Sequence, residues 1–216
     1  MMNAPSRAHP EERMSSPLLI VISAPSGGGK TTLCRQLIDT TPGMSRAITC
    51  TTRPPRAGEG DGVDYFFLDA KTFARRIEAG EFLEHATVFG NQYGTLKSEV
   101  RDKLSANQDV LLNIDVQGAS AIRARSAEDS ELKRALLSVF LTPATISVLK
   151  QRLRGRGTDP EDVIQRRLKV ARTEIAEWVN FDYLIISTTV SEDLRRMQVV
   201  LEAERMRQHR ARAPEL

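Results

Sequence analysis

The sequence of 216 residues predicts an α/β fold in which a parallel β-sheet is covered by helices on both faces. Short apolar runs rich in branched residues alternate with longer segments whose apolar residues recur at helical spacing. Such runs are typical of parallel strands, because these strands are buried on both faces. The apolar runs are residues 18–22, 110–115, 136–141 and 183–187. We therefore expect the loops that follow these strands to line one ligand-binding crevice.

The segments between the strands have the periodicity of amphipathic helices. These segments are residues 33–38, 98–106, 144–153, 160–179 and 192–206. Residues 49–97 interrupt the alternation and are rich in Thr, Arg, Gly, Tyr and Phe. They contain a predicted short strand at 65–68 and a predicted helix at 72–79. We interpret 49–97 as an insertion with its own small fold.

Composition narrows the class of protein. Hydrophobic residues make up 40% of the chain and charged residues 27%, as in an ordinary globular enzyme. No apolar stretch is long enough for a membrane helix, so we expect no membrane-embedded role. The two cysteines, Cys34 and Cys50, have neither a disulfide framework nor a metal-ligand spacing, which fits a reducing cytoplasm. The net charge is +3, and we interpret the basic run at 205–212 as a solvated helix end rather than a nucleic-acid-binding arm.

A glycine-rich run follows the first predicted strand and leads into a helix. Consecutive glycines let backbone N–H groups converge on phosphate oxygens, Lys30 is placed to reach β- and γ-phosphates, and Thr31 can ligate Mg²⁺. The usual pattern begins with glycine where this chain has Ala24, which matters only if the first turn needs a positive φ. The alternative is a glycine-rich turn beside a surface lysine. The flanking strand and helix favour a loop that binds a nucleoside triphosphate, here through Ala24, Pro25, Ser26, Gly27, Gly28, Gly29, Lys30, Thr31 and Thr32.

Six further motifs follow this loop in order. They are residues 49–59 (TCTTRPPRAGE), 60–65 (GDGVDY), 81–85 (EFLEH), 90–95 (GNQYGT), 113–118 (NIDVQG) and 152–159 (RLRGRGTD). Together they closely resemble guanylate kinase over about residues 18–205. The resemblance implies a P-loop NTPase fold of the nucleoside monophosphate kinase type, with a small GMP-binding insertion and a lid. It also implies transfer of a phosphoryl group from ATP to GMP with Mg²⁺ as cofactor.

Two arginines in the first of these motifs suit an acceptor phosphate. A dianionic phosphate matches the planar, bidentate guanidinium group better than it matches lysine. The resemblance assigns the GMP phosphate to Arg53 and Arg56, with Tyr65 and Tyr93 as hydroxyl donors. In isolation, two arginines near prolines would indicate only a basic surface loop.

A carboxylate suits recognition of guanine, because it accepts hydrogen bonds from N1–H and N2–H₂ of this base. With adenine, the same carboxylate would face the lone pair of N1. The resemblance assigns this task to Glu84, with Thr49 where the family usually carries serine. It also places Glu59 and Thr95 in the GMP site. The alternative for Glu84 is an exposed carboxylate at a helix end.

The chain departs from the family at Asn113, where a second guanine-binding aspartate is common. An amide oxygen can still accept from N2–H, and a neutral hydrogen bond is weaker than a charged one by about 1 kcal/mol, less than tenfold in affinity. We therefore expect weaker GMP binding with specificity retained. Asp115 matches the family's second strand-end aspartate. Its role is to hold a Mg²⁺-bound water, to orient acceptor groups or only to fix the loop.

A second basic cluster lies in a glycine-punctuated loop before a helix start at 158–161. Such a segment can close over a bound nucleotide as a lid. The resemblance implies that Arg156 and Arg167 approach the transferred phosphoryl group. Arg152 and Arg154 are interpreted as electrostatic support.

The predicted catalytic residues are Lys30, Arg56, Arg156 and Arg167, and no general base is required because the attacking phosphate oxygen is already ionised. Arg166 is the alternative in the lid, although it can pair with Asp162 at i,i+4. At residues 187–189 the family usually has Asn-Asp near the donor adenine. The adenine contacts therefore stay open, and relaxed donor choice is one outcome.

The predicted organisation has six parts. They are a disordered extension (1–16), a core with the phosphate loop (17–48), the GMP-binding insertion (49–97), more core (98–142), the lid region (143–172), and core with a basic C-terminal helix (173–216). The expected partners are ATP and GMP, without nucleic acid or membrane, in guanine nucleotide recycling in the cytoplasm. Two rivals remain: a kinase for another phosphorylated ribose compound, which would not need Thr49 and Glu84, and a non-catalytic scaffold that binds peptides.

Overall fold

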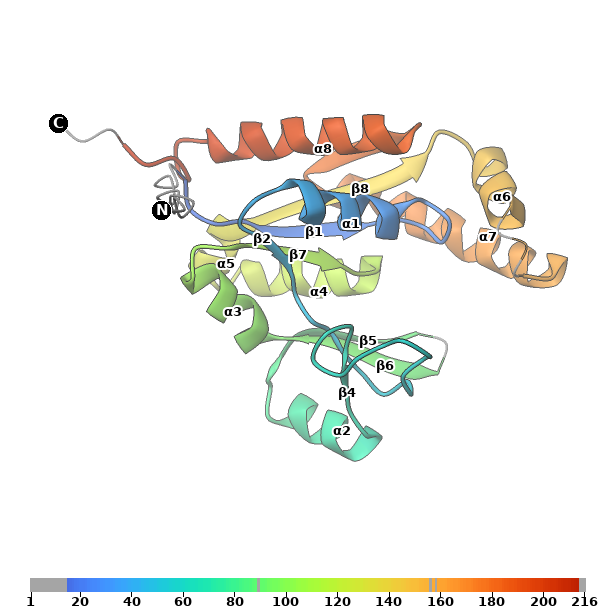
Figure 1. Cartoon of the computed structure of the whole chain (residues 1–216), viewed down its shortest axis with the longest axis horizontal. Helices are drawn as coiled ribbons and strands as arrows, with labels where there is room; N and C mark the ends of the chain where they lie inside the picture. Colours follow the sequence, from blue (N-terminus) through green and yellow to red (C-terminus); the bar gives the residue numbers. More distant parts are fainter. Residues whose placement is uncertain (1–14, 89, 156, 158, 214–216) are drawn as a thin grey trace, which may run out of the picture.

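A computed structural model describes residues 15–88, 90–155, 157 and 159–213. Its centre is a five-stranded sheet in the order β2-β7-β1-β8-β9, with every neighbouring pair parallel (Figure 1). The strands are β1 (Leu19–Ser23), β2 (Met44–Arg46), β7 (Asp109–Asn113), β8 (Leu136–Pro143) and β9 (Tyr183–Ser187). The predicted parallel α/β core is confirmed, because the four apolar runs form strands of one parallel sheet, and β1 at its centre is buried throughout.

Helices cover the two faces of this sheet (Figure 1). On one face, alternate residues of β1 such as Ile20 pack with Leu37 and Met197 from two helices, α1 (Lys30–Thr40) and α8 (Val190–Arg205). On the other face, Leu19 and Val21 pack against a second group of helices. That group comprises α3 (Lys97–Ser105), α4 (Val116–Ser126) and α5 (Ser130–Ala135).

Two of these helices, α4 and α5, are absent from the sequence-based expectations. The sequence prediction extended the strand to Asp115, but β7 ends at Asn113 and Asp115 caps α4 by accepting a 2.8 Å hydrogen bond from the amide of Gly118. The helix packs on the sheet through Gly118, Ala119 and Ile122. Because Gly118, Ala119 and Ser126 are small and Ile122 is the one large apolar residue among the buried positions, the helix shows no clear apolar pattern of helical period in the sequence.

The insertion forms a second, four-stranded sheet in the order β4-β3-β6-β5. Its strands are β3 (Cys50–Thr51), β4 (Phe66–Phe67), β5 (Phe82–Val88) and β6 (Asn91–Leu96), and helix α2 (Ala70–Glu78) covers it. Phe73 of α2 stacks on Phe82 of β5, with ring centroids 4.5 Å apart, over a small core that includes Cys50 and Leu96. This sheet lies beside the α3–α4 side of the central sheet (Figure 1).

Helices α6 (Ile146–Gly155) and α7 (Glu161–Ala176) extend from one end of the central sheet (Figure 1). They have a separate apolar cluster, in which Leu149 and Leu153 of α6 meet Ile164 and Leu168 of α7. Pro160 stands just before the first turn of α7, not at its first position. A short 3₁₀ helix, η1 (Glu177–Asn180), connects α7 to β9.

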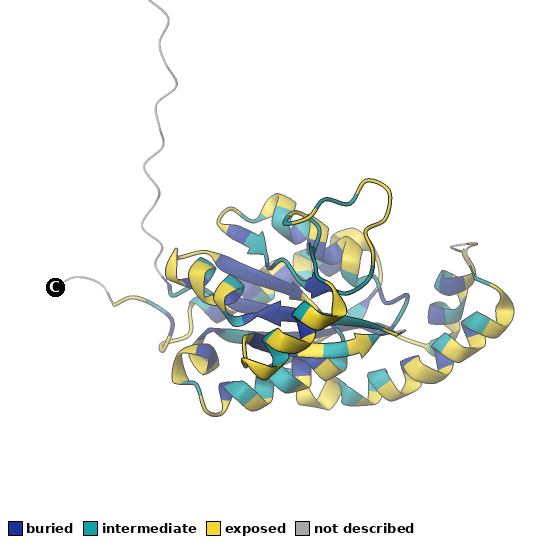
Figure 2. Cartoon of the chain, turned by 90° about the horizontal axis from the view of Figure 1, so that it is seen from below, coloured by how far each residue is buried: buried dark blue, intermediate teal, exposed yellow. Residues whose placement is uncertain are grey.

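Burial follows this layering. Figure 2 shows the buried residues concentrated in the central strands, whereas the outer faces of the helices are exposed. The α6–α7 pair projects from the main body in the same view and carries many exposed residues. Within the described residues, no helix combines the length and apolar character needed to cross a membrane.

The C-terminal basic run is partly buried, so its interpretation as a solvated helix end is wrong for two arginines. Arg205 pairs at 2.7 Å with the buried carboxylate of Asp109. Arg210, only 4% exposed, donates to the carbonyl oxygens of Arg134 (3.0 Å) and Leu136 (2.7 Å) and pairs with the buried Glu204. These partners meet the arginines only in the folded chain.

The predicted disordered extension also ends earlier than expected. Residues 1–14 lie outside the described residues, but Ser15 is buried and forms an antiparallel bridge with Ala211. The amide of Ser16 donates to the carbonyl oxygen of Arg210 at 2.9 Å. Residues 15 and 16 therefore belong to the folded domain, because the C-terminal segment supplies their backbone partners.

Arg210→Ala is expected to destabilise the fold by about 3 kcal/mol, because it removes the buried partner of Glu204, which is then left with the exposed Arg207 and the Tyr183 hydroxyl, and also removes two charged hydrogen bonds to backbone carbonyls. Thermal unfolding should show a midpoint lower by roughly 6 to 12 °C. The control is Arg212→Ala, which removes an exposed arginine two residues away. Equal midpoints for the two variants would contradict a structural role for Arg210.

Candidate active site

The glycine-rich loop turns from the end of β1 into α1. Gly27 and Gly29 have φ values of +88° and +102°, a region that favours glycine. A Cβ on Gly28 would lie 2.9 Å from both the Ala24 Cβ and the Pro25 carbonyl oxygen. Across the described part of the chain, Asn107 is the one non-glycine residue with a positive φ. The alanine at position 24 therefore carries no backbone strain.

Lys30 begins α1 and points toward the neighbouring strand end. Its Nζ donates to the carbonyl oxygen of Ile114 at 2.8 Å. Burial lowers the pKa of Lys30, while the charges of Asp115 and Glu174 act in the opposite direction. The adjacent residues Thr31 and Thr32 are exposed at the first turn of the helix. The loop thus presents backbone, ammonium and hydroxyl groups at the carboxyl end of the sheet.

A cavity of about 310 Å³ lies between the insertion and the central sheet. It brings together six of the predicted site residues, namely Thr49, Tyr65, Glu84, Tyr93, Asn113 and Asp115. It also includes two residues that sequence reasoning missed, Arg46 and Asp64. Arg46 is held by hydrogen bonds to the carbonyl oxygens of Val63 (2.8 Å) and Asp64 (2.7 Å). No motif marks Arg46, because its place in the cavity depends on how the insertion folds back on β2.

The two predicted phosphate arginines lie outside this lining. Arg53 pairs with both carboxylate oxygens of Glu59 at 2.8 and 2.9 Å, and its guanidinium carbon lies 5.3 Å from the centre of the Tyr65 ring. Glu59 also accepts a 2.8 Å hydrogen bond from the amide of Arg56, whose side chain is exposed. Glu59 therefore organises the arginine loop and does not face the cavity.

Glu84 is the buried carboxylate of the cavity, with 4% of its surface exposed. It lies in β5, so the alternative of an exposed carboxylate at a helix end is wrong. The hydroxyl of Thr95, itself buried behind Glu84, donates to Oε1 at 2.7 Å. Burial raises the pKa of Glu84 to about 7, the Thr95 hydrogen bond lowers it and the charge of Asp115 adds to the rise.

A second hollow of about 410 Å³ lies on the other side of the glycine-rich loop. It is lined by residues that include Gly27, Gly29, Thr32, Arg152, Ser187, Thr188 and Asp193. Arg152 of α6 reaches across it to the Ser187 hydroxyl (3.0 Å) and the Thr188 carbonyl oxygen (3.2 Å). Asp193 accepts from the Ser187 hydroxyl at 2.6 Å and from the Thr188 amide at 3.0 Å. Arg152 therefore ties α6 to the turn that precedes α8.

Three further arginines of the lid region pair with carboxylates. Arg154 pairs with Glu161 at 2.8 Å, and Arg167 pairs with Asp159 at 3.1 Å. Arg166 forms the expected i,i+4 pair with Asp162 at 2.8 Å on the exposed face of α7. The predicted residue Arg156 lies outside the described residues.

Comparison with known proteins agrees with this arrangement. A family model described as guanylate kinase matches residues 16–204. The chain belongs to the guanylate kinase family. It is 42% identical over 193 residues to the guanylate kinase of Nitrobacter winogradskyi, covering 89% of this chain and 85% of that protein. It is 43% identical over 190 residues to that of Ruegeria pomeroyi, covering 88% and 87% respectively.

A solved structure supports the same fold. The crystal structure of guanylate kinase from Anaplasma phagocytophilum superposes with a TM-score of 0.71 at 31% sequence identity. The superposition covers 91% of this chain and 90% of that one. The chain therefore shares the fold of that guanylate kinase over nearly its whole length.

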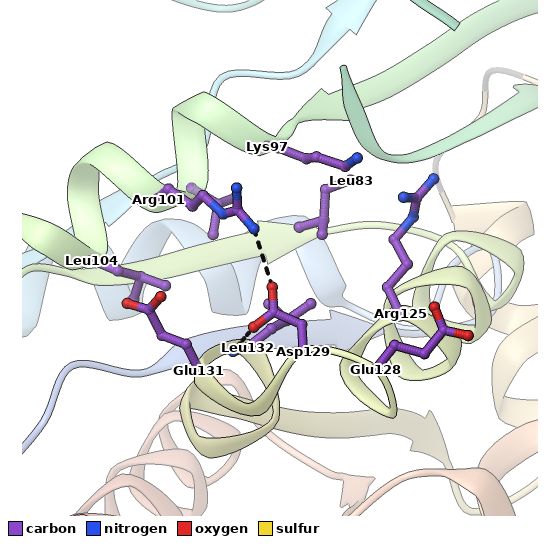
Figure 3. Close-up of a pocket in the computed structure, with 10 residues that line it drawn as sticks. Leu83, Lys97, Arg101, Leu104, Arg125, Glu128, Asp129, Glu131 and Leu132 are labelled. Atoms are coloured by element: carbon purple, nitrogen blue, oxygen red, sulfur yellow. Dashed lines mark hydrogen bonds and ion pairs between the residues drawn. The ribbon is translucent and has the colours of Figure 1, made fainter. Parts of the chain in front are cut away.

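Another hollow, of about 260 Å³, lies between α3, α4 and α5 in this member of the guanylate kinase family (Figure 3). Leu83 and Leu132 belong to its apolar lining, and Arg101 of α3 pairs with Asp129 at 3.2 Å (Figure 3). Asp129 also caps α5 by accepting from the amide of Leu132 at 3.0 Å. None of the described residues that line it belongs to the predicted site. This hollow is therefore separate from the crevice beside the glycine-rich loop.

Glu84→Gln is expected to stabilise the protein by about 3 kcal/mol at pH 8 and by much less at pH 5. The folded-state pKa of about 7 lies above that of the unfolded chain, so the folded state holds the proton more tightly. Stability is then greatest below the unfolded pKa and is lost as pH rises through about 7. Denaturant unfolding of both proteins at the two pH values measures this difference.

The matched control for that measurement is Glu78→Gln, which removes an exposed carboxylate at the end of α2. Its effect should be small and should not change sign or size between the two pH values. An equal effect of Glu84→Gln at pH 5 and pH 8 would show that Glu84 does not carry the buried charge.

Proposed function

We propose that the protein transfers the γ-phosphoryl group of ATP to the phosphate of GMP, giving ADP and GDP. The observation that carries the proposal is a hydrogen bond that joins the glycine-rich loop to the lining of the acceptor cavity. Lys30, which begins the helix after the glycine-rich loop, donates to Ile114, and Ile114 lines the cavity that contains Glu84. A donor phosphate held by the loop and an acceptor in that cavity would meet at this point. Membership of the guanylate kinase family supports the same reaction.

On the donor side, the loop amides and Lys30 would hold the β- and γ-phosphates. The family implies Mg²⁺ with ATP, and within the described residues no cluster of three or more His, Cys, Asp or Glu could hold a metal ion. The exposed Thr31 hydroxyl at the first turn of α1 fits an ion that takes most of its ligands from phosphate and water. Such an ion would neutralise charge that develops on the phosphates.

On the acceptor side, Tyr65 and Tyr93 line the cavity, and the Arg53 guanidinium lies outside the lining against the Tyr65 ring. These three side chains would bind the GMP phosphate. Glu84 and Thr49 would read the base, because the carboxylate accepts from N1–H and N2–H₂ of guanine. Adenine, which presents the N1 lone pair at this edge, would give the buried carboxylate no donor beyond the Thr95 hydroxyl. Sites of this kind discriminate by about 10⁴- to 10⁵-fold.

Transfer would proceed by attack of an ionised GMP phosphate oxygen on the γ-phosphorus as the bond to the ADP oxygen breaks. Lys30, Arg56 and Arg167, with Arg156, would balance the charge on the transferred group. Arg167 is held by Asp159, so closure of the 143–172 region must exchange this ion pair for a contact with phosphate. We further propose that the enzyme acts in the cytoplasm, in the recycling of guanine nucleotides.

A coupled assay of ADP release with ATP and each of GMP, AMP, CMP and UMP tests the reaction. GMP is expected to be used at least about 10⁴-fold more efficiently than AMP, because only guanine satisfies the buried Glu84 carboxylate. Lys30→Met is the control, expected to abolish most turnover with modest loss of GMP binding. Equal rates with AMP would refute guanine reading, and no turnover with GMP would favour a non-catalytic scaffold.

Asn113→Asp is expected to lower KM for GMP by less than tenfold, because a charged acceptor replaces a neutral one. Asn113 is exposed at the end of β7 and lines the acceptor cavity, so the change adds no buried charge. Steady-state kinetics with saturating ATP measures the effect. An unchanged or higher KM would contradict the role of Asn113 in the GMP site.

A further inference from the structure

Gly118 lies where the two sheets meet. It is buried in the first turn of α4, which covers the central sheet, and its amide donates to the cap residue Asp115 at 2.8 Å. Glu84 approaches the same turn from β5 of the insertion. The predicted guanine-reading carboxylate thus comes from one sheet and packs against a helix that belongs to the other.

The absence of a side chain at position 118 leaves room for this carboxylate. A Cβ on Gly118 would lie 2.9 Å from Oε2 of Glu84, 3.4 Å from its Cδ and 3.3 Å from Cδ1 of Ile114. The distance to Oε2 is shorter than real Cβ atoms show, so one of the two groups would have to move. The φ of Gly118 is not positive, so its backbone conformation does not require glycine. Glycine is needed at this position because a side chain would not fit.

The Glu84 carboxylate is held on the side away from Gly118. Its other oxygen, Oε1, is held by the buried hydroxyl of Thr95 at 2.7 Å. Displacement by a methyl group at position 118 would break that hydrogen bond or turn Oε2 out of its present place. The end of the Glu84 side chain is flexible, whereas the helix backbone is not, so the movement falls on the carboxylate.

We propose that Gly118 is a specificity-determining positioning residue, whose lack of a side chain fixes where the Glu84 carboxylate meets the guanine base. This inference rests on the proposed function, in which Glu84 accepts hydrogen bonds from guanine. Gly118 lines neither the acceptor cavity nor the hollow beside the glycine-rich loop, and it acts through Glu84. Its effect is therefore specific to the acceptor base and leaves the donor site alone.

The test is Gly118→Ala, with GMP binding measured by calorimetry and turnover measured in parallel. The Kd and KM for GMP should rise about tenfold to 100-fold, the loss expected when a charged hydrogen bond is broken. The KM for ATP and the kcat at saturating GMP should stay within about twofold. The midpoint of unfolding should change little, because the higher helix propensity of alanine offsets part of the cost of disturbing the buried hydrogen bond from Thr95 to Glu84.

A second experiment, made in the Glu84→Asp variant, distinguishes a positioning effect from a general loss of structure. In Glu84→Asp the carboxylate is shorter by one methylene group and withdraws from the methyl at position 118. Adding Gly118→Ala to Glu84→Asp should therefore cause little further loss of GMP affinity. Ser120→Ala, on an exposed position of the same helix, is the matched control and should bind GMP like the unsubstituted protein.

An unchanged Kd for GMP in Gly118→Ala would overturn the inference. So would a loss of the same factor in both Glu84 backgrounds, or a loss of GMP binding that accompanies a large fall in the unfolding midpoint. Failure of the proposed function is recognised separately, because the unsubstituted protein would then neither bind nor phosphorylate GMP.

Discussion

The parallel pairing of β1 with β7 is the constraint on which the site depends. Their register places Ile22 beside Asn113, so the glycine-rich loop and the acceptor cavity begin at neighbouring strand ends. The hydrogen bond from Lys30 to the carbonyl oxygen of Ile114 connects the loop directly to the strand end that lines the cavity. A shift of one residue in this register would turn every side chain of the strand to the other face and separate the two half-sites.

Burial of the acceptor site comes from the contact between the insertion and the helices of the core. Glu84 is buried because β5 lies against α4, and this burial raises its pKa while leaving the Thr95 hydroxyl as its donor within the insertion. A buried carboxylate without its ligand is costly, and the same cost makes it selective for a ligand that donates hydrogen bonds. Stability and base recognition are therefore opposed at this position.

The sequence predicts the central strands and the phosphate loop because their signals are local: branched apolar runs, and glycines beside Gly-Lys-Thr. The motif around Glu84 predicts that this residue belongs to the acceptor site. The local sequence does not predict that it lies in a strand, because the adjacent residues Leu83 and Glu84 are both buried and break the alternation of buried and exposed residues that is typical of a strand. Gly118 and Arg46 depend on contacts between distant segments. Arg210 was misjudged for the same reason, because its partners Glu204 and Leu136 assemble only in the folded chain.

The bridge between Ser15 and Ala211 brings the two ends of the described chain together at the amino ends of the parallel strands. The glycine-rich loop follows the carboxyl end of β1, at the opposite end of the parallel strands (Figure 1). The acceptor cavity includes Asn113, at the carboxyl end of β7. A short peptide joining residues 15 and 211 would therefore make a circular backbone whose new ends could be opened elsewhere on the surface. The position of the chain ends could thus be changed without altering how the glycine-rich loop and the acceptor cavity lie relative to each other.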